Sequence, residues 1–310
     1  MAVAALRLTA VTELLDLPRP ESGVLLAEVD WTARRAAHQA RVDGWLAGHR
    51  ERRSRGRSHP VEDFLFEYYN QRPYQLRRWH PGPGVVLAGP AAAELLSWRG
   101  YVEVEAGVTL DTSAVLASRA ATVRWVRDLL TATAGRAGYF GCFGLHEWAM
   151  VYRQSADELR HPGWPLRMPA EAVAAVVEER GVRCGHVDAF RFFTPAARPL
   201  NLLQPTRADQ TALEQPGCLH ANMDLYKWTY KLSPLVPSDL VADAFALARE
   251  IRELDMRASP YDFTALGLEP VAVETPEGRA AYATAQRQFA ARSAPLRQRL
   301  LDVLDPLLAG

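Results

Sequence analysis

The chain has 310 residues, 48% of them hydrophobic and 23% charged, and its 36 basic and 36 acidic residues give a net charge of zero. These values are typical of a globular protein that buries a core without disulfides, and they argue against a protein that coats polyanions through its overall charge. The three cysteines are far apart in sequence, so we expect neither a disulfide framework nor a CxxC zinc site. Near the N-terminus no apolar run is long enough for an export signal or membrane span, and we expect a cytoplasmic protein without a membrane partner.

The first half of the chain is expected to be mainly helical. Residues 1–29 read as a tail or short helix that ends near two prolines. From Asp30 onward apolar residues recur at helical spacing, until an arginine-rich stretch ends at Gly56. The elements predicted after it are a helix that starts at Pro60, a loop at 71–84, strands at 85–88 and 101–104 around a helical turn at 90–98, and a helix at 112–134.

The second half continues this pattern. Four glycines between residues 135 and 144 precede the segment 145–152. The elements predicted after it are helices at 171–180, 219–232, 238–255 and 276–308, strands at 187–193 and 271–274, and a loop at 195–217. Because no repeat or linker is visible, residues 30–310 are predicted to form one mainly α domain with a few short strands, either as one body or as two lobes that meet near residues 100–140.

Three short segments place an imidazole beside a carboxylate, a combination that serves metal binding and acid–base chemistry. The candidate metal ligands, for iron, manganese or zinc, are His59, Glu62, His146, Glu147, His220 and Asp224. The candidate catalytic residues are Glu62, Asp63, Glu147, Asp224 and Lys227. In the first segment, with His59, Glu62 and Asp63, helix capping explains the residues equally well. In the second, with His146 and Glu147, ordinary packing is the alternative explanation. In the third, His220, Asp224 and Lys227 share one face of a helix, which is typical of a helix that lines a cleft.

Basic residues and aromatic residues are concentrated in one region. Arginine supplies 34 of the 36 basic residues, as in proteins from GC-rich genomes, so most arginines need no functional explanation. The local excess between residues 50 and 57 nevertheless predicts phosphate contacts, with nearby aromatic rings to stack on bases. The candidate substrate-binding residues are Arg52, Arg53, Arg55, Arg57, Tyr68, Tyr69, Tyr226 and Trp228. A solvated or partner-facing patch is the alternative.

Five strings in this chain carry a resemblance to a known family. They are SRGRSHPVEDFLFEYYNQRP, QLRRWHPGPGVVLAG, GCFGLHEWAMVYR, EQPGCLHANMDLYKW and LDMRASPYDF. On these strings the chain resembles a family of bacterial proteins from GC-rich genomes that are commonly labelled 3-methyladenine DNA glycosylase. The resemblance covers most of the chain, roughly from Asp30 to Leu300.

The resemblance implies hydrolysis of the N-glycosidic bond of an alkylated base in DNA repair, with DNA as partner and no required cofactor. Such an enzyme needs arginines for the phosphates, an aromatic pocket for a flipped base and a carboxylate at the sugar, and Lys227 would permit an imine mechanism. The chain lacks the leucine-proline-glycine-valine-glycine hairpin of helix-hairpin-helix glycosylases, and it shows no helical-repeat array. No catalytic residue therefore carries over by position.

Two other classes of function remain open from the residues alone. One is a metal-dependent helical oxidase or hydrolase that acts on a small molecule, for example with a dinuclear iron centre. This class of function accounts for the three acid–imidazole segments. A non-catalytic nucleic-acid-binding protein explains the arginines alone.

Overall fold

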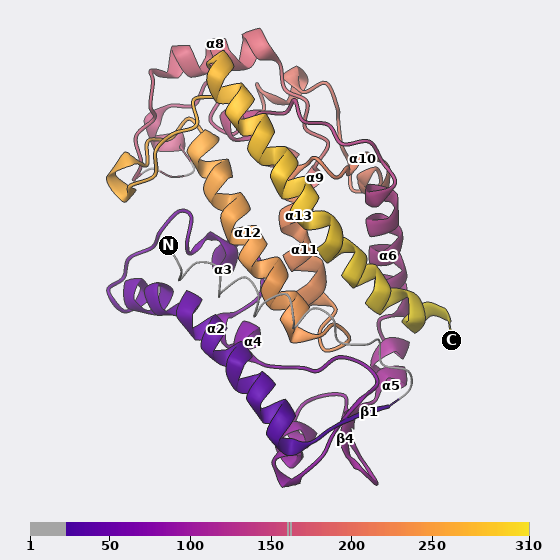
Figure 1. The fold of residues 1–310 in the computed structure, drawn as a ribbon. Coiled ribbons are helices and arrows are strands. Elements are labelled where there is room, and N and C mark those ends of the chain that lie inside the picture. The colour runs from indigo at the N-terminus through magenta and orange to yellow at the C-terminus, as the bar shows by residue number, and fades with distance from the viewer. Residues whose placement is uncertain (1–22, 160, 162, 310) are drawn as a thin grey trace, which may run out of the picture.

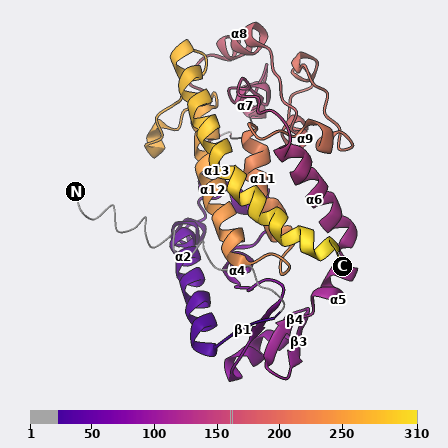
Figure 2. The same cartoon turned by 45° about the vertical axis from the view of Figure 1, so that its right-hand side comes forward.

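The computed structural model describes residues 23–159, 161 and 163–309. Three long helices lie side by side at its centre: α11 (Leu219–Lys231), α12 (Ser238–Ala258) and α13 (Pro276–Ala309) (Figure 1). Helix α6 (Ala120–Ala134) packs along α13, and α2 (Glu28–Ser54) runs on the other side, against α12 (Figure 2). The described chain is thus mainly helical, and its buried apolar residues form one core.

Helix α11 is the innermost element of this core. All residues from Leu219 to Thr229 are buried, although several of them are polar or charged. Buried polar groups need partners inside the protein. The sequence of α11 therefore requires that the surrounding elements bring complementary polar side chains to it.

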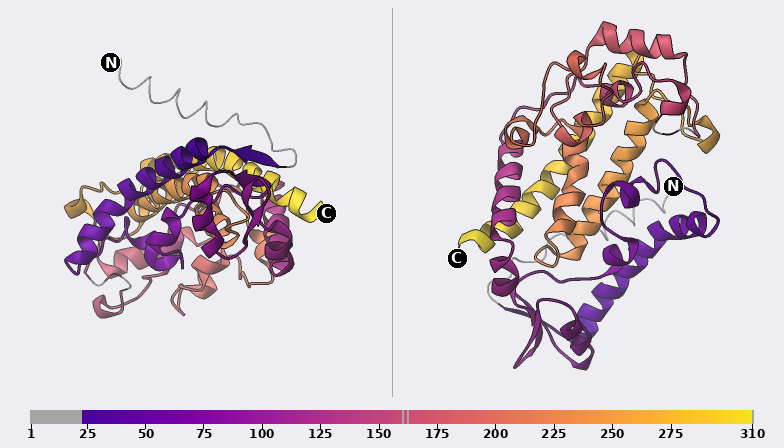
Figure 3. Two further views of the ribbon diagram at one scale, coloured as in Figure 1. Left: turned by 90° about the horizontal axis from the view of Figure 1, so that it is seen from below. Right: turned by 180° about the vertical axis from the view of Figure 1, so that it is seen from behind.

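A small sheet closes the end of the bundle that lies away from α8 (Ala170–Arg180) (Figures 2 and 3). Its strands are β1 (Val24–Leu26), β2 (Val85–Leu87), β3 (Tyr101–Val104) and β4 (Gly107–Leu110), in the order β1-β2-β4-β3. Only the β1–β2 pair is parallel. A side chain at Gly107, with its φ of 146°, would collide with the carbonyl of Leu87, so the close approach of β4 to β2 requires glycine.

Shorter helices connect these parts. They are α3 (Phe64–Tyr68), α4 (Pro73–Arg77), α5 (Thr112–Ala117), α7 (Leu145–Ala149), α9 (Val187–Phe190) and α10 (Gln210–Leu213), with 3-10 turns at Pro90–Ser97, Ala156–Glu158, Arg198–Leu200 and Thr264–Leu266. No helix within the described part of the chain has the length and apolar character needed to cross a bilayer.

The mainly α fold class with a small β component is confirmed. The strands at 85–88 and 101–104, the turn between them and the long helices agree closely with the prediction. Two strand predictions are wrong: residues 187–190 form α9, and residues 271–274 form no strand. The helix expected at 112–134 is divided between α5 and α6, and the expected loop at 71–84 contains α4. The prediction for the first 29 residues falls largely outside the described residues, although β1 and the start of α2 lie within it.

His80 provides a pH-dependent contribution to this part of the fold. Its Nδ1 lies 2.9 Å from the hydroxyl of Tyr101, and its ring stacks on the Tyr101 ring. Burial lowers the pKa of His80 from 6.5 to about 4. A group with a lowered folded pKa stabilises fully above its unfolded pKa, and this stability is lost as pH falls towards the folded value.

We therefore expect the free energy of unfolding to drop by about 1–3 kcal/mol between pH 6.5 and 4 on account of His80. Urea titrations of the wild type and His80→Gln across this range measure the effect. The difference between the two proteins should shrink as pH falls, because glutamine does not titrate. A constant difference would contradict the assignment.

Candidate functional site: a buried histidine–carboxylate centre

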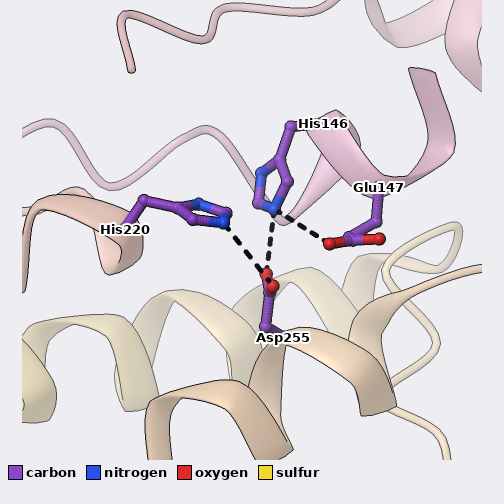
Figure 4. Close-up of side chains that lie close together, drawn as sticks. All are labelled: His146, Glu147, His220 and Asp255. Carbon is purple, nitrogen blue, oxygen red and sulfur yellow. Dashed lines mark hydrogen bonds and ion pairs between the residues drawn. The ribbon is translucent and has the colours of Figure 1, made fainter. Parts of the chain in front are cut away.

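Two histidines and two carboxylates meet where α7, α11 and α12 come together. His146 and Glu147 are on α7, His220 is on the first turn of α11, and Asp255 is near the end of α12. All four are buried, and one potential ligand atom from each lies within 4.8 Å of the others. Figure 4 shows both imidazoles pointing at the carboxylate of Asp255.

The distances in this cluster fit a metal site. His146 Nε2 lies 2.9 Å from Asp255 Oδ1 and 3.9 Å from Glu147 Oε1, and His220 Nε2 lies 3.9 Å from Asp255 Oδ2. Ligands about 2.1 Å from one ion lie about 3–4 Å from each other. Small side-chain rotations would therefore suffice for all four residues to bind one cation.

The charges around the cluster are partly balanced by Arg252, one turn before Asp255. Its Nη1 lies 3.1 Å from Glu147 Oε1 and 3.1 Å from Asp255 Oδ2. Burial opposes ionisation of Asp255, but His146, His220 and Arg252 outweigh it and hold the pKa of Asp255 below its usual value. Burial and the neighbouring His146 lower the pKa of His220 to about 3. The imidazole of His220 is therefore neutral and able to donate a lone pair at neutral pH.

The backbone around α7 is unusual. Phe143 and Arg153 are the two non-glycine residues in the described part of the chain with positive φ, at 48° and 54°. They flank the segment that carries His146 and Glu147, and Gly144 between them has a φ of 69°. Such conformations cost free energy and persist only where the surroundings impose them. The fold therefore holds the short helix α7 in a defined position.

A second cluster adjoins the first. His186 is the N-cap residue of α9, and its ring stacks on that of His220 with a centroid distance of 5.2 Å. Its Nδ1 accepts a hydrogen bond from the backbone N–H of Ala189, which assigns the proton of the neutral ring to Nε2. That Nε2 lies 3.4 Å from Asp224 Oδ2 and 3.7 Å from Glu214 Oε1. Because Nδ1 is held as an acceptor by the backbone N–H of Ala189, the Nε2 proton cannot move to Nδ1 and free a lone pair for a metal. Hydrogen bonding therefore suits this cluster better than metal binding.

The carboxylate oxygens of Asp224 are also engaged by other donors. Tyr69 donates to Oδ1 at 2.7 Å, and Lys227 donates to Oδ2 at 2.8 Å. Lys227 bridges to Asp188 as well, again at 2.8 Å. Burial disfavours the ammonium group, but Asp224 and Asp188 outweigh it and raise the pKa of Lys227. The imine role proposed for Lys227 is therefore not supported, because a nucleophilic lysine must lose its proton.

A cavity of about 270 Å³ borders both clusters. His146, His186 and His220 line its wall, and so do all three cysteines, Cys142, Cys184 and Cys218. The cysteines are free, and burial raises their pKa values, so they contribute thiol surface rather than thiolate ligands. A second hollow, of about 10 Å³, also borders His220, and the polar residues in its mixed lining include Glu147 and Arg252. It has room for about one water molecule.

The first acid–imidazole segment does not join the site. His59 Nδ1 accepts hydrogen bonds from the backbone N–H groups of Val61 and Glu62, as in a turn cap. Asp63 accepts hydrogen bonds from Arg52, His49 and the His59 backbone, and Glu62 pairs with the Arg249 side chain. His59 and Asp63 thus tie the end of α2 to the next turn, and Glu62 ties this turn to α12. The metal-ligand role of His59 and Glu62 and the catalytic role of Asp63 are therefore not supported.

The predicted nucleic-acid residues also do not form one surface. Arg52 is bound to Asp63, whereas Arg53, Arg55 and Arg57 are exposed, and Arg55 pairs with Glu51. Tyr69, Tyr226 and Trp228 are buried in the core, and Tyr68 is half-buried beside them. Rings packed against Phe245, Tyr230 and Trp125 are not free to stack on a base. Glu147 and Asp224 are the predicted catalytic carboxylates that do lie beside the cavity-lining histidines.

Of the six metal ligands predicted from the sequence, His146, Glu147 and His220 lie in the first cluster, Asp224 lies in the second cluster, and His59 and Glu62 lie in neither. Asp255, Arg252, His186 and Glu214 are not among the residues predicted from the sequence. The one available signal for Arg252 and Asp255 is their i, i+3 spacing on an apolar helix. No protein-family model, curated protein or solved structure matches the chain.

Proposed function

We propose that this protein is a metal-dependent enzyme that acts on a small molecule, with one divalent cation bound by His146, Glu147, His220 and Asp255. The convergence of these four buried side chains from three separate elements carries the proposal. Burying two carboxylates and two imidazoles is costly without a compensating charge. Arg252 supplies one permanent positive charge against the two carboxylates. Burial disfavours the charged imidazole of His146, but Asp255 and Glu147 outweigh burial and raise its pKa, and a bound cation would take the place of the His146 proton.

The ligand types narrow the choice of metal. Mixed imidazole and carboxylate ligands suit Zn²⁺, Fe²⁺ and Mn²⁺ better than Mg²⁺ or Ca²⁺. Such a cation supplies Lewis acidity and activates bound water, and iron or manganese also supports oxidation. The water-sized hollow and the 270 Å³ cavity both border His220, and we infer that they hold a water molecule and a substrate respectively. We infer a mononuclear centre, because the second cluster is occupied by Lys227, Tyr69 and the proton on His186.

Metal analysis of purified variants tests the proposal. We expect about one equivalent of zinc, iron or manganese in the wild type and less than about a tenth of that in His220→Gln. The matched control is His186→Gln, which lies on the same cavity but should retain the metal. Circular dichroism and melting curves establish that all three proteins are folded.

Two results would contradict the proposal. One is a wild-type protein that stays metal-free after reconstitution with each of the three cations. The other is equal metal loss in His186→Gln and His220→Gln. The glycosylase activity that the family resemblance implies remains a prediction, and release of 3-methyladenine from alkylated DNA by metal-free protein would favour it over our proposal.

A further inference from the structure

The cavity beside the histidines carries different charges at its two ends. Its inner wall carries the buried side chains of His146, His186 and His220. Its outer wall carries two arginines, of which Arg183 is exposed and Arg136 is half-buried. A molecule that enters the cavity therefore meets positive charge first and the histidine–carboxylate centre last.

Arg183 is available to a ligand. Its guanidinium carbon lies 4.5 Å from the ring centroid of Tyr139, which fixes the flat face of the group by a cation–π contact. No carboxylate of residues 23–159, 161 and 163–309 forms an ion pair with Arg183. Arg136, by contrast, donates from Nη1 to the backbone carbonyl of Glu214 at 2.7 Å. Arg183 is thus oriented by Tyr139, and no carboxylate of the described residues accepts its hydrogen bonds.

The remaining wall is suited to an apolar body. It is formed in large part by aliphatic and thiol side chains, namely Val182, Leu203, Leu213, Leu219, Cys142, Cys184 and Cys218. The one carboxylate on the wall, Glu214, is bound by Gln210 and lies 3.7 Å from His186 Nε2, and burial raises its pKa. It therefore opposes an anion at the outer wall only weakly.

We propose that the cavity binds a small carboxylic acid with an apolar body, and that Arg183 is the residue that selects the carboxylate. The guanidinium fork matches a carboxylate with two parallel hydrogen bonds. Its place on the outer wall puts the carboxylate near solvent and the apolar end near His220. The volume of about 270 Å³ limits the ligand to a small molecule. This inference rests on the proposed function only for the reaction at the His220 end of the cavity, because carboxylate binding itself does not need the metal.

Isothermal titration of the full chain with benzoate, hexanoate and the neutral benzamide tests the inference. We expect at least one of the two carboxylates to bind, and benzamide to bind at least about tenfold more weakly than benzoate if benzoate is the one bound. Arg183→Gln should lower carboxylate affinity about tenfold or more, and Arg183→Lys should recover only part of it because lysine lacks the fork. The matched control is Arg180→Gln, an exposed arginine three residues earlier that pairs with Glu179 and should have no effect.

Metal content is measured on the same preparations, so that the two proposals fail separately. Carboxylate binding that needs Arg183, in a protein that stays metal-free after reconstitution with each of the three cations, would support this inference and contradict the proposed function. Binding of neither carboxylate, or equal binding by the wild type and Arg183→Gln, would overturn this inference whatever the metal content.

Discussion

Replacing Asp255 by asparagine should destabilise the protein by about 3–5 kcal/mol even without metal, because it breaks a fully buried ion pair from one side. The substitution removes the carboxylate charge that faces His146 and Arg252, both of which are buried. Their positive charges would remain in the interior, where water cannot solvate them.

The metal adds a second contribution, which a chelator separates from the first. A ligand that binds only the folded state stabilises by about 4 kcal/mol when its concentration is a thousand times its dissociation constant. Denaturant unfolding in EDTA should therefore give the ion-pair contribution alone, and unfolding with saturating metal should give a larger difference between wild type and Asp255→Asn.

The control for Asp255 lies on the same helix. Glu250 pairs with Arg292 at 2.6 and 2.7 Å, but both side chains are about half exposed, so Glu250→Gln should cost less than about 1 kcal/mol. A cost for Asp255→Asn as small as that of the control would contradict the buried pair. An unchanged difference on adding metal would contradict Asp255 as a ligand.

The main helices could be predicted because their signals are local. In α2 the buried residues Trp31, His38, Val42, Leu46 and His49 follow helical spacing, which is visible in the sequence alone. The prediction of a strand at 187–193 failed because a short alternation of apolar residues also arises in a four-residue helix. There the ring of His186 accepts a hydrogen bond from the backbone of Ala189 and starts α9, and periodicity does not reveal such a cap.

The site residues also fall into two groups, those that the sequence predicts and those that only the tertiary fold brings together. His146 and Glu147 are adjacent in sequence, so their shared chemistry could be proposed without a structure. Asp255 lies 109 residues from His146, and only the packing of α7 against the end of α12, where Trp148 donates to the Ala258 carbonyl, brings it to the imidazole. The three cysteines show the same limitation, since their spacing in sequence indicated no common site, although they line one cavity. Long-range contacts of this kind depend on the tertiary fold rather than on any local pattern.

The charge network behind the site gives the other large expected effect. Lys227→Met would leave the buried carboxylates of Asp188 and Asp224 without the ammonium group that joins them at 2.8 Å on each side. We expect the free energy of unfolding to fall by about 3–5 kcal/mol. Arg207 on Asp188 and Tyr69 on Asp224 remain, which keeps the loss from being larger.

The chain contains its own control for this substitution, because the other of its two lysines, Lys231, is one turn further along α11. Lys231 is exposed, and Lys231→Met should change the stability by less than about 0.5 kcal/mol. A double-mutant cycle of Lys227→Met with Asp224→Asn should show a coupling of more than about 1 kcal/mol, since removing both charges restores neutrality. Equal effects at the two lysines, or additive effects in the cycle, would mean that Lys227 is not the charge that allows Asp188 and Asp224 to be buried beside the site.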